Sequence, residues 1–260
     1  MDIKTKLLTL ALAAGITGRA SGQILVNETF DHPNGNLLGQ TPKPGPGGTW
    51  AAHSGGGNRP IQVTSGQAIV EHADSSGEDL NTGFAVLVTG WIYYGFDFSV
   101  SASGPITGTD GEYFAHFKDS AFDFTTRTSI ESAQSTGDYT MGFSASSSDP
   151  DSLWATDLAF NTVYRAVAGY NIDSGAGQLW LDPTSASSTF ISAAADVGVD
   201  VESFGLRHST SDANETIAVD NLIVSTDFNS AAAVPEPEMF GALAGLMVLG
   251  FAVFRRRRQG

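Results

Sequence analysis

The stretch FAVLVTGWIYYGFDFSV, residues 84–100, decides the fold. Most of its residues are β-branched or aromatic, and its apolar positions show no helical spacing. Strict alternation points one set of side chains toward a core: Phe84, Val86, Val88, Ile92, Tyr94, Phe96, Phe98 and Val100. The opposite face is less apolar but carries Trp91 and Tyr93. We therefore predict one long strand with an apolar face and a second, partly aromatic face.

The sequence on both sides of this stretch repeats the pattern in shorter runs, each bounded by Gly, Ser, Asn, Asp or Pro. Further strands are predicted at 23–30, 61–63, 68–71, 112–118, 126–131, 139–143, 162–171, 178–181, 203–208 and 216–226. The clearest hairpin spans 164–183, where the glycines of 173–177 permit the positive φ that a reversal needs. So many short strands predict an all-β sandwich or barrel.

The second aromatic face suggests a binding surface. In the 112–118 strand, alternation puts Phe114 and His116 on one side together. Flat aromatic rings stack on the apolar faces of sugars, and polar side-chain tips hydrogen-bond to them. We therefore predict a glycan-binding platform made of Trp91, Tyr93, Phe114 and His116.

Two alternatives to this platform stay open. The rings could pack beneath a long loop, which would make them part of the core. A bulge at Gly90 or Gly95 could also exchange the two faces of the strand.

Five features are spaced along most of the chain: ETFDHPNGNLLGQ (28–40), Trp50, SGGGNRPIQV (54–63), the 164–183 hairpin and VDNLIV (219–224). This pattern resembles the concanavalin A-like and laminin-G-like jelly rolls. The resemblance implies a two-sheet antiparallel β-sandwich (jelly roll) with one concave outer face. It also implies that the first and last strands, 23–30 and 216–226, pair with each other.

The beginning of the chain has the features of an export signal. Lys4 and Lys6 precede an apolar stretch, 7–16, and the small residues Ala20 and Gly22 follow it. This order predicts a secretory signal peptide over 1–22, cleaved after Gly22.

The end of the chain carries an uncharged apolar run, 239–254. It is followed at once by four arginines, Arg255, Arg256, Arg257 and Arg258. As a helix the run would be about 24 Å long, which flanking arginines can adapt to a hydrocarbon core of roughly 30 Å. We predict a transmembrane helix over 239–254 and a basic cytoplasmic tail over 255–260. The alternative is a buried core helix with a solvated basic end.

Directly before this run stand Pro235, Glu236 and Pro237. A leader, Pro-Glu-Pro, a short apolar span and an arginine cluster together resemble the PEP-CTERM sorting signal. The resemblance implies recognition by an exosortase-type processing enzyme, cleavage near 235–237 and loss of the span. It also implies an inner-membrane intermediate, followed by the cell surface or extracellular matrix of a Gram-negative bacterium.

These predictions divide the chain into five parts. They are a signal peptide (1–22), a jelly-roll domain (23–228), a linker with the Pro-Glu-Pro motif (229–238), a transmembrane helix (239–254) and a basic tail (255–260).

The charge of the chain limits its partners. The whole sequence has 28 Asp and Glu against 13 Lys and Arg, but its two ends hold seven of these basic residues. Residues 23–234 therefore keep six basic residues against 25 acidic ones, a net charge near −19. Such a surface disfavours nucleic acid and anionic lipid as partners. There is no cysteine, so the exported domain must be stable without disulfides.

The sequence contains no recognised catalytic motif. No predicted strand has the closely spaced carboxylates that glycosidases of this fold use. There is no G-x-S-x-G, no H-E-x-x-H and no phosphate-binding loop that leads into a helix. We expect an exported, non-enzymatic surface or matrix protein that binds carbohydrate. The alternative is a glycan-active hydrolase or lyase with an unrecognised site.

We expect no cofactor, with calcium as the one exception. Hard cations bind loop oxygens, and the acidic loops could supply them from Asp74, Glu78, Asp79, Asp149 and Asp151. The alternative is that these carboxylates are solvated loop residues with no metal.

Overall fold

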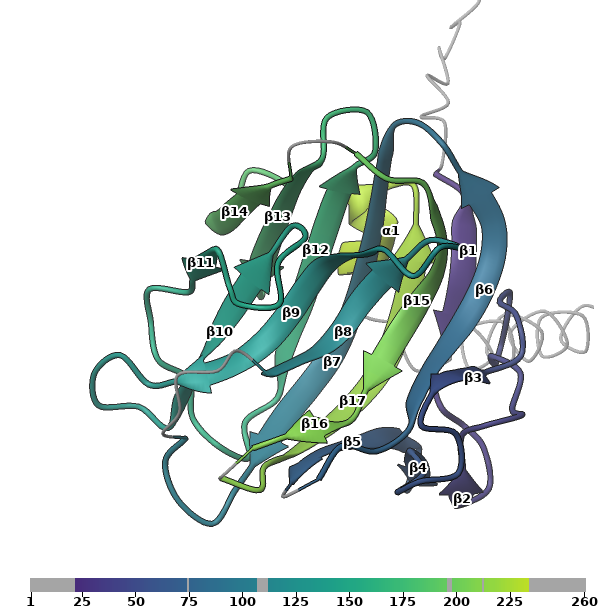
Figure 1. The fold of residues 1–260 in the computed structure, drawn as a ribbon. Helices are drawn as coiled ribbons and strands as arrows, with labels where there is room; N and C mark the ends of the chain where they lie inside the picture. The colour runs from purple at the N-terminus through teal and green to yellow at the C-terminus, as the bar shows by residue number, and fades with distance from the viewer. Residues whose placement is uncertain (1–21, 74, 107–111, 196–197, 212, 234–260) are drawn as a thin grey trace, which may run out of the picture.

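A computed structural model describes residues 22–233, apart from 74, 107–111, 196–197 and 212. Within these residues the chain forms two β-sheets that stack face to face, and a single short helix (Figure 1). Every pairing of named strands is antiparallel except the two-residue contact of β16 with β5. The predicted fold class, an all-β two-sheet antiparallel sandwich, is confirmed.

The segments predicted at the two chain ends lie outside the described residues. These are the signal peptide up to residue 21, the Pro-Glu-Pro motif, the span at 239–254 and the arginine tail. In the part of the chain that the structure describes, no helix is long and apolar enough to cross a membrane.

One sheet has ten strands, in the order β14-β13-β12-β7-β17-β5-β4-β2, with β1 paired to β17 and β16 to β5. Its strands are β1 (Ile24–Glu28), β2 (Gly35–Asn36), β4 (Gln62–Thr64), β5 (Gln67–Ala73), β7 (Trp91–Ser101), β12 (Tyr164–Asn171), β13 (Ala176–Leu181), β14 (Phe190–Ala194), β16 (Ser209–Thr210) and β17 (Thr216–Ser225). We call it the ten-stranded sheet.

The other sheet has seven strands, in the order β11-β10-β9-β8-β15-β6-β3, and lies in front in Figure 1. Its strands are β3 (Ala51–Ser54), β6 (Asp79–Leu87), β8 (Glu112–Lys118), β9 (Phe124–Ser132), β10 (Tyr139–Ser144), β11 (Ser152–Leu153) and β15 (Val201–Arg207). We call it the seven-stranded sheet.

The prediction of one long strand over 84–100 is wrong. The chain leaves the seven-stranded sheet at the end of β6 and enters the ten-stranded sheet with β7. Gly90 lies in the turn between them with a φ of 83°, a conformation that residues with a Cβ rarely adopt. Val86 and Val88 lie at the end of β6 and just beyond it, where the pairing with β15 shifts register, and they are 53% and 56% exposed rather than core residues.

The second half of the same stretch behaves as predicted. The alternating residues of β7 from Ile92 to Val100 are all buried, and their rings fill the space between the sheets. The Tyr94 ring lies 4.9 Å from Phe117 of β8 and 5.1 Å from Phe204 of β15, as measured between ring centroids. Each such buried side chain contributes about 1.5–3 kcal/mol, so this aromatic layer holds the two sheets together.

Two further predictions are confirmed. β1 pairs with β17 in the register Val26 to Val224, so the ends of the domain lie together in one sheet. The 164–183 hairpin forms from β12 and β13, and Gly175 supplies the positive φ in its turn.

The linker predicted from residue 229 begins too early. Residues 229–232 belong to the helix α1 (Phe228–Ala232), whose N-cap Asp227 accepts a hydrogen bond from the Ser230 backbone N–H at 2.9 Å. Phe228 and Ala231 are buried against the ten-stranded sheet. This burial explains why so short a segment is helical, since a five-residue helix is unstable without tertiary packing.

Candidate functional site

The four residues predicted as one platform lie in three different places. Trp91 and Tyr93 lie on the outer face of the ten-stranded sheet. Phe114 is fully buried between the sheets, with its ring 5.7 Å from that of Phe96. His116 lies on the outer face of the seven-stranded sheet. The prediction that they share one face is wrong.

The reason lies partly in β8. The pairing of this strand with β9 shifts register between Tyr113 and Ala115, and again between Ala115 and Phe117. As a result Phe114 and Ala115 both belong to the core, and alternation no longer places Phe114 beside His116. Tyr113 and His116 are the outward pair instead, with ring centroids 5.5 Å apart.

On the ten-stranded sheet, α1 covers part of the outer aromatic set. Tyr93 meets the Phe228 ring edge-on at 5.8 Å, and Trp180 meets the same ring at 4.9 Å. Trp91 stacks on Tyr93 at 5.7 Å and stays half-buried. The alternative in which the rings pack beneath another segment therefore holds for Tyr93, with a helix rather than a loop above it.

A buried arginine attaches α1 to this face. Arg165 donates hydrogen bonds to the Ala231 carbonyl oxygen at 2.7 Å and to an Asp97 carboxylate oxygen at 2.9 Å. Gly95 allows the close approach, because a Cβ there would lie 2.0 Å from the Ala231 oxygen. The helix is thus held by residues of β7, β12 and β13 in the ten-stranded sheet.

The outer face of the seven-stranded sheet is built differently, around His116. The imidazole of His116 lies 4.5 Å from the Phe124 ring and 5.5 Å from the His53 ring. It lies over Gly205 of β15, where a Cβ would approach the ring to 2.7 Å. The residues His53, Tyr113, His116, Phe124, Arg127 and Arg207 form what we call the His116 cluster.

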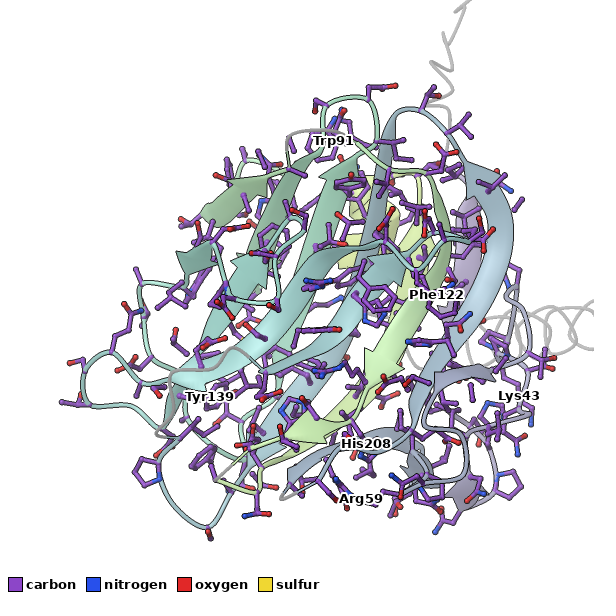
Figure 2. All side chains as sticks on the ribbon, in the orientation of Figure 1. Lys43, Arg59, Trp91, Phe122, Tyr139 and His208 are labelled. Atoms are coloured by element: carbon purple, nitrogen blue, oxygen red, sulfur yellow. The ribbon has the colours of Figure 1, made fainter. Side chains whose placement is uncertain are left out.

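Cations lie against the aromatic rings of this cluster. The Arg127 guanidinium is 4.9 Å from the Tyr113 ring centroid, and the Arg207 guanidinium is 4.3 Å from it. Next to the cluster, the Lys118 ammonium lies 4.5 Å from the Phe122 ring. Phe122 itself is 56% exposed and appears in front of the seven-stranded sheet, whereas Trp91 lies at the top of the view (Figure 2).

Two of these cations have no acidic partner in the part of the chain that the structure describes. Arg207 pairs with Glu112 at 3.6 Å. Among the described residues Arg127 and Lys118 form no ion pair, and they donate instead to the backbone oxygens of Ser146 (2.8 Å) and Asp119 (2.7 Å). Half of the six basic residues in 23–234 therefore lie on this one face of a strongly acidic chain.

The histidines of the cluster are neutral at neutral pH. Burial lowers the pKa of His53 to about 4, and the charge of Lys118 adds to the effect. Burial also holds the pKa of His116 well below its usual range, with His53 and the three nearby cations contributing. Neither ring nitrogen of His116 has a hydrogen-bond partner among the described residues, a situation that costs about 1–3 kcal/mol for a buried polar atom.

A cavity of about 290 Å³ adjoins the cluster. Its lining includes Phe122, Asp123, Phe124, Arg127 and Ser146. The volume is near the lower end of ligand pockets, which start at about 300 Å³. The lining also includes Tyr170 of β12 and Val199, so the cavity lies at the margin where the start of β9 meets the ten-stranded sheet.

The acidic loops show no metal site in the described residues. No group of three or more His, Asp or Glu is placed there to hold a metal ion. The Glu78 carboxylate accepts from the backbone N–H groups of Gly57 (2.9 Å) and Ile61 (3.2 Å), and Asp151 accepts from Ala145 at 3.1 Å. Position 74 lies outside the described residues. Calcium stays a prediction.

No model of a known protein family matches the chain, and no curated protein matches it. A structure of botulinum neurotoxin type C, described as interacting with two ganglioside molecules, matches with a TM-score of 0.51 at 7% identity. The match covers 79% of this chain and 48% of the neurotoxin chain, so this chain spans about half the neurotoxin's length.

Two other solved structures are less similar. A lectin from Bauhinia forficata in complex with GalNAc has a TM-score of 0.47 at 11% identity, over 79% of this chain and 98% of the lectin. An alginate lyase from Corynebacterium sp. has a TM-score of 0.44 at 10% identity, over 63% of this chain and 79% of the lyase. At these identities the neurotoxin match shows a shared β-sandwich fold and nothing about the site.

Proposed function

We propose that this protein binds carbohydrate, without chemistry, through the outer face of the seven-stranded sheet at the His116 cluster. The observation that carries the proposal is the exposed Phe122 ring beside a cavity that Phe124 and Arg127 line. An exposed ring offers a flat surface for a sugar, and a guanidinium in a cavity offers hydrogen-bond donors for its oxygens. The gangliosides with which the neurotoxin is described as interacting are also sugar-bearing molecules.

The expected affinity is modest. Each stacked ring contributes on the order of 1 kcal/mol beyond its burial. Among the described aromatic residues of this face only Phe122 is widely exposed, while His116 and Tyr113 are buried. A platform of this size suits repeated weak contacts along a polymer better than tight capture of one sugar.

A panel of neutral and acidic polysaccharides tests this function. The processed protein should be retarded in gels that contain at least one of them, with no release of reducing ends. Retention with release of reducing ends would instead support the alternative, a glycan-active hydrolase or lyase. Free migration through every gel would refute carbohydrate binding.

We further propose that the protein is exported and sorted by a PEP-CTERM signal. The support is the sequence: the predicted signal peptide at 1–22, Pro235-Glu236-Pro237, the 239–254 span and the arginine cluster. An exosortase-type enzyme would process an inner-membrane intermediate and release the domain to the cell surface or extracellular matrix. Since α1 ends at Ala232, cleavage near Pro235 would fall just beyond the folded domain.

Intact-mass measurement of the surface-released protein tests this sorting. The mass should correspond to a chain that starts near residue 23 and stops near 234–237. A mass that still includes Arg255–Arg258 would contradict the sorting signal and indicate a permanent anchor.

A further inference from the structure

The guanidinium of Arg127 is fixed in place but only partly hydrogen-bonded. The rings of Tyr113 and Phe124 lie 4.9 Å and 5.6 Å from it, and Nη1 donates to the Ser146 oxygen. Its Nε is buried and has no partner among the described residues. A planar guanidinium with unused donors is the group that proteins use to bind carboxylate and sulfate oxygens.

The charges around Arg127 favour an anion. Lys118 has no ion pair among the described residues, and Arg207 shares its charge with Glu112. Burial lowers the pKa of Arg127, and the charge of Arg207 lowers it further, although the nearby Tyr113 opposes this. Among the described residues these three cations form one ion pair, that of Arg207 with Glu112, so they repel one another and an anionic ligand would relieve that repulsion.

Two further carboxyl groups on this face, those of Asp79 and Asp123, bear on whether an anion can bind there. Asp79, which lies opposite Arg207 across the β6–β15 pairing, has a pKa raised to about 6 by burial. Asp123 is exposed and lines the cavity, and its backbone N–H donates to the Asp119 carboxylate. Among the described residues Asp123 is the one carboxylate that lines the cavity, so its removal should strengthen the binding of an anion.

We propose that the ligand of the His116 cluster is an acidic polysaccharide. Its carboxylate or sulfate group binds Arg127 in the cavity, and a neighbouring sugar ring stacks on Phe122. This inference rests on the proposed function and adds the chemical class of the glycan. It also explains why an acidic protein keeps half of its few basic residues on one face.

Matched polymers test the role of the ligand's charge. We expect the processed protein to be retained by polygalacturonate about tenfold better than by its fully methyl-esterified form. Dextran sulfate and dextran form a second pair, which shows whether sulfate can replace carboxylate. Equal retention by the charged and uncharged members of both pairs would overturn the inference but leave carbohydrate binding intact. Retention by no polysaccharide would refute the proposed function itself.

Three variants test the protein side on polygalacturonate, each with its melting temperature recorded. Arg127→Gln should weaken retention about tenfold. Asp123→Asn, at an exposed site that leaves the fold intact, should strengthen retention at least twofold. Lys43→Gln removes the same charge as Arg127→Gln from an exposed loop that carries none of these groups, and should leave retention unchanged. If Lys43→Gln weakens retention as much as Arg127→Gln, or if Asp123→Asn changes nothing, the assignment to this cavity is overturned.

Discussion

The two outer faces of the sandwich both present aromatic rings and an arginine, but they use them in opposite ways. On the ten-stranded sheet, Arg165 is paired with Asp97 and bound to α1, whose Phe228 packs on Trp180. On the seven-stranded sheet, Arg127 lies against rings with no carboxylate partner among the described residues, beside a cavity. The face that we propose for binding is therefore the one whose arginine has no carboxylate partner among the described residues.

The largest effect that separates the faces is expected for Trp180→Ala. Trp180 is 1% exposed between the sheet and α1, and removing a buried Trp costs about 3–5 kcal/mol. Urea unfolding measures the loss, with Phe190→Ala on the neighbouring edge strand as a control that should cost about 1 kcal/mol or less. A loss below 1 kcal/mol for Trp180→Ala would mean that α1 does not cover this face in solution.

The ion pair beneath α1 gives the next effect. Arg165→Met leaves the half-buried Asp97 without its partner and frees the last turn of the helix, so we expect a loss of about 3 kcal/mol. The double variant with Asp97→Asn should recover part of it, because no uncompensated charge remains. Calorimetric unfolding of both proteins checks this prediction. Equal melting temperatures for the wild type and Arg165→Met would contradict it.

A smaller effect is expected at the margin of the covered face. Trp91 is half-buried and stacks on Tyr93, so Trp91→Ala should cost about 1 kcal/mol of stability. Retention by polygalacturonate should not change, because Trp91 and the His116 cluster lie on opposite sheets. Lost retention with an unchanged melting temperature would transfer the binding surface to the ten-stranded sheet.

The smallest effect concerns pH. The pKa of His53 is lowered to about 4 in the folded state, so its stabilising contribution is complete above the unfolded value near 6.5 and is lost as the pH falls toward 4. His53→Asn should therefore lose less stability than the wild type between pH 7.5 and pH 4.5. The full pKa difference would give roughly 2.5 kcal/mol, and we expect about 1 kcal/mol because solvent screens the partly exposed ring. Asp79, with its raised pKa, acts in the opposite direction in both proteins. Urea unfolding of both proteins at the two pH values measures this difference. Equal losses of unfolding free energy in the two proteins would mean that His53 is solvated.

Much of the fold could be predicted from the sequence because local patterns encode it. The alternation from Ile92 to Val100, the hairpin of β12 with β13 and the pairing of β1 with β17 are all confirmed. The turn at Gly90 could not be predicted, since one glycine inside an apolar run also suits a bulge. The short strands β2, β3, β11, β14 and β16 were missed, because two to five residues carry too little pattern.

The candidate site was less predictable than the fold. The register shifts in β8 place the apolar Phe114 and Ala115 both inward, and no residue there distinguishes this from plain alternation. Arg127 and Arg207 come from strands far apart in the sequence, so their meeting at Tyr113 depends on strand order. The sequence does carry one indication of the site. Residues 23–234 hold only six basic residues, so each of them is a candidate ligand-binding residue.

Retention by polygalacturonate, compared between Arg127→Gln and Trp91→Ala, tests the central claim most directly. The claim is that the outer face of the seven-stranded sheet binds an acidic glycan and that the face under α1 does not. We predict that Arg127→Gln loses about tenfold in retention at a nearly unchanged melting temperature, whereas Trp91→Ala is retained like the wild type. Full retention of Arg127→Gln together with loss of retention in Trp91→Ala would contradict it.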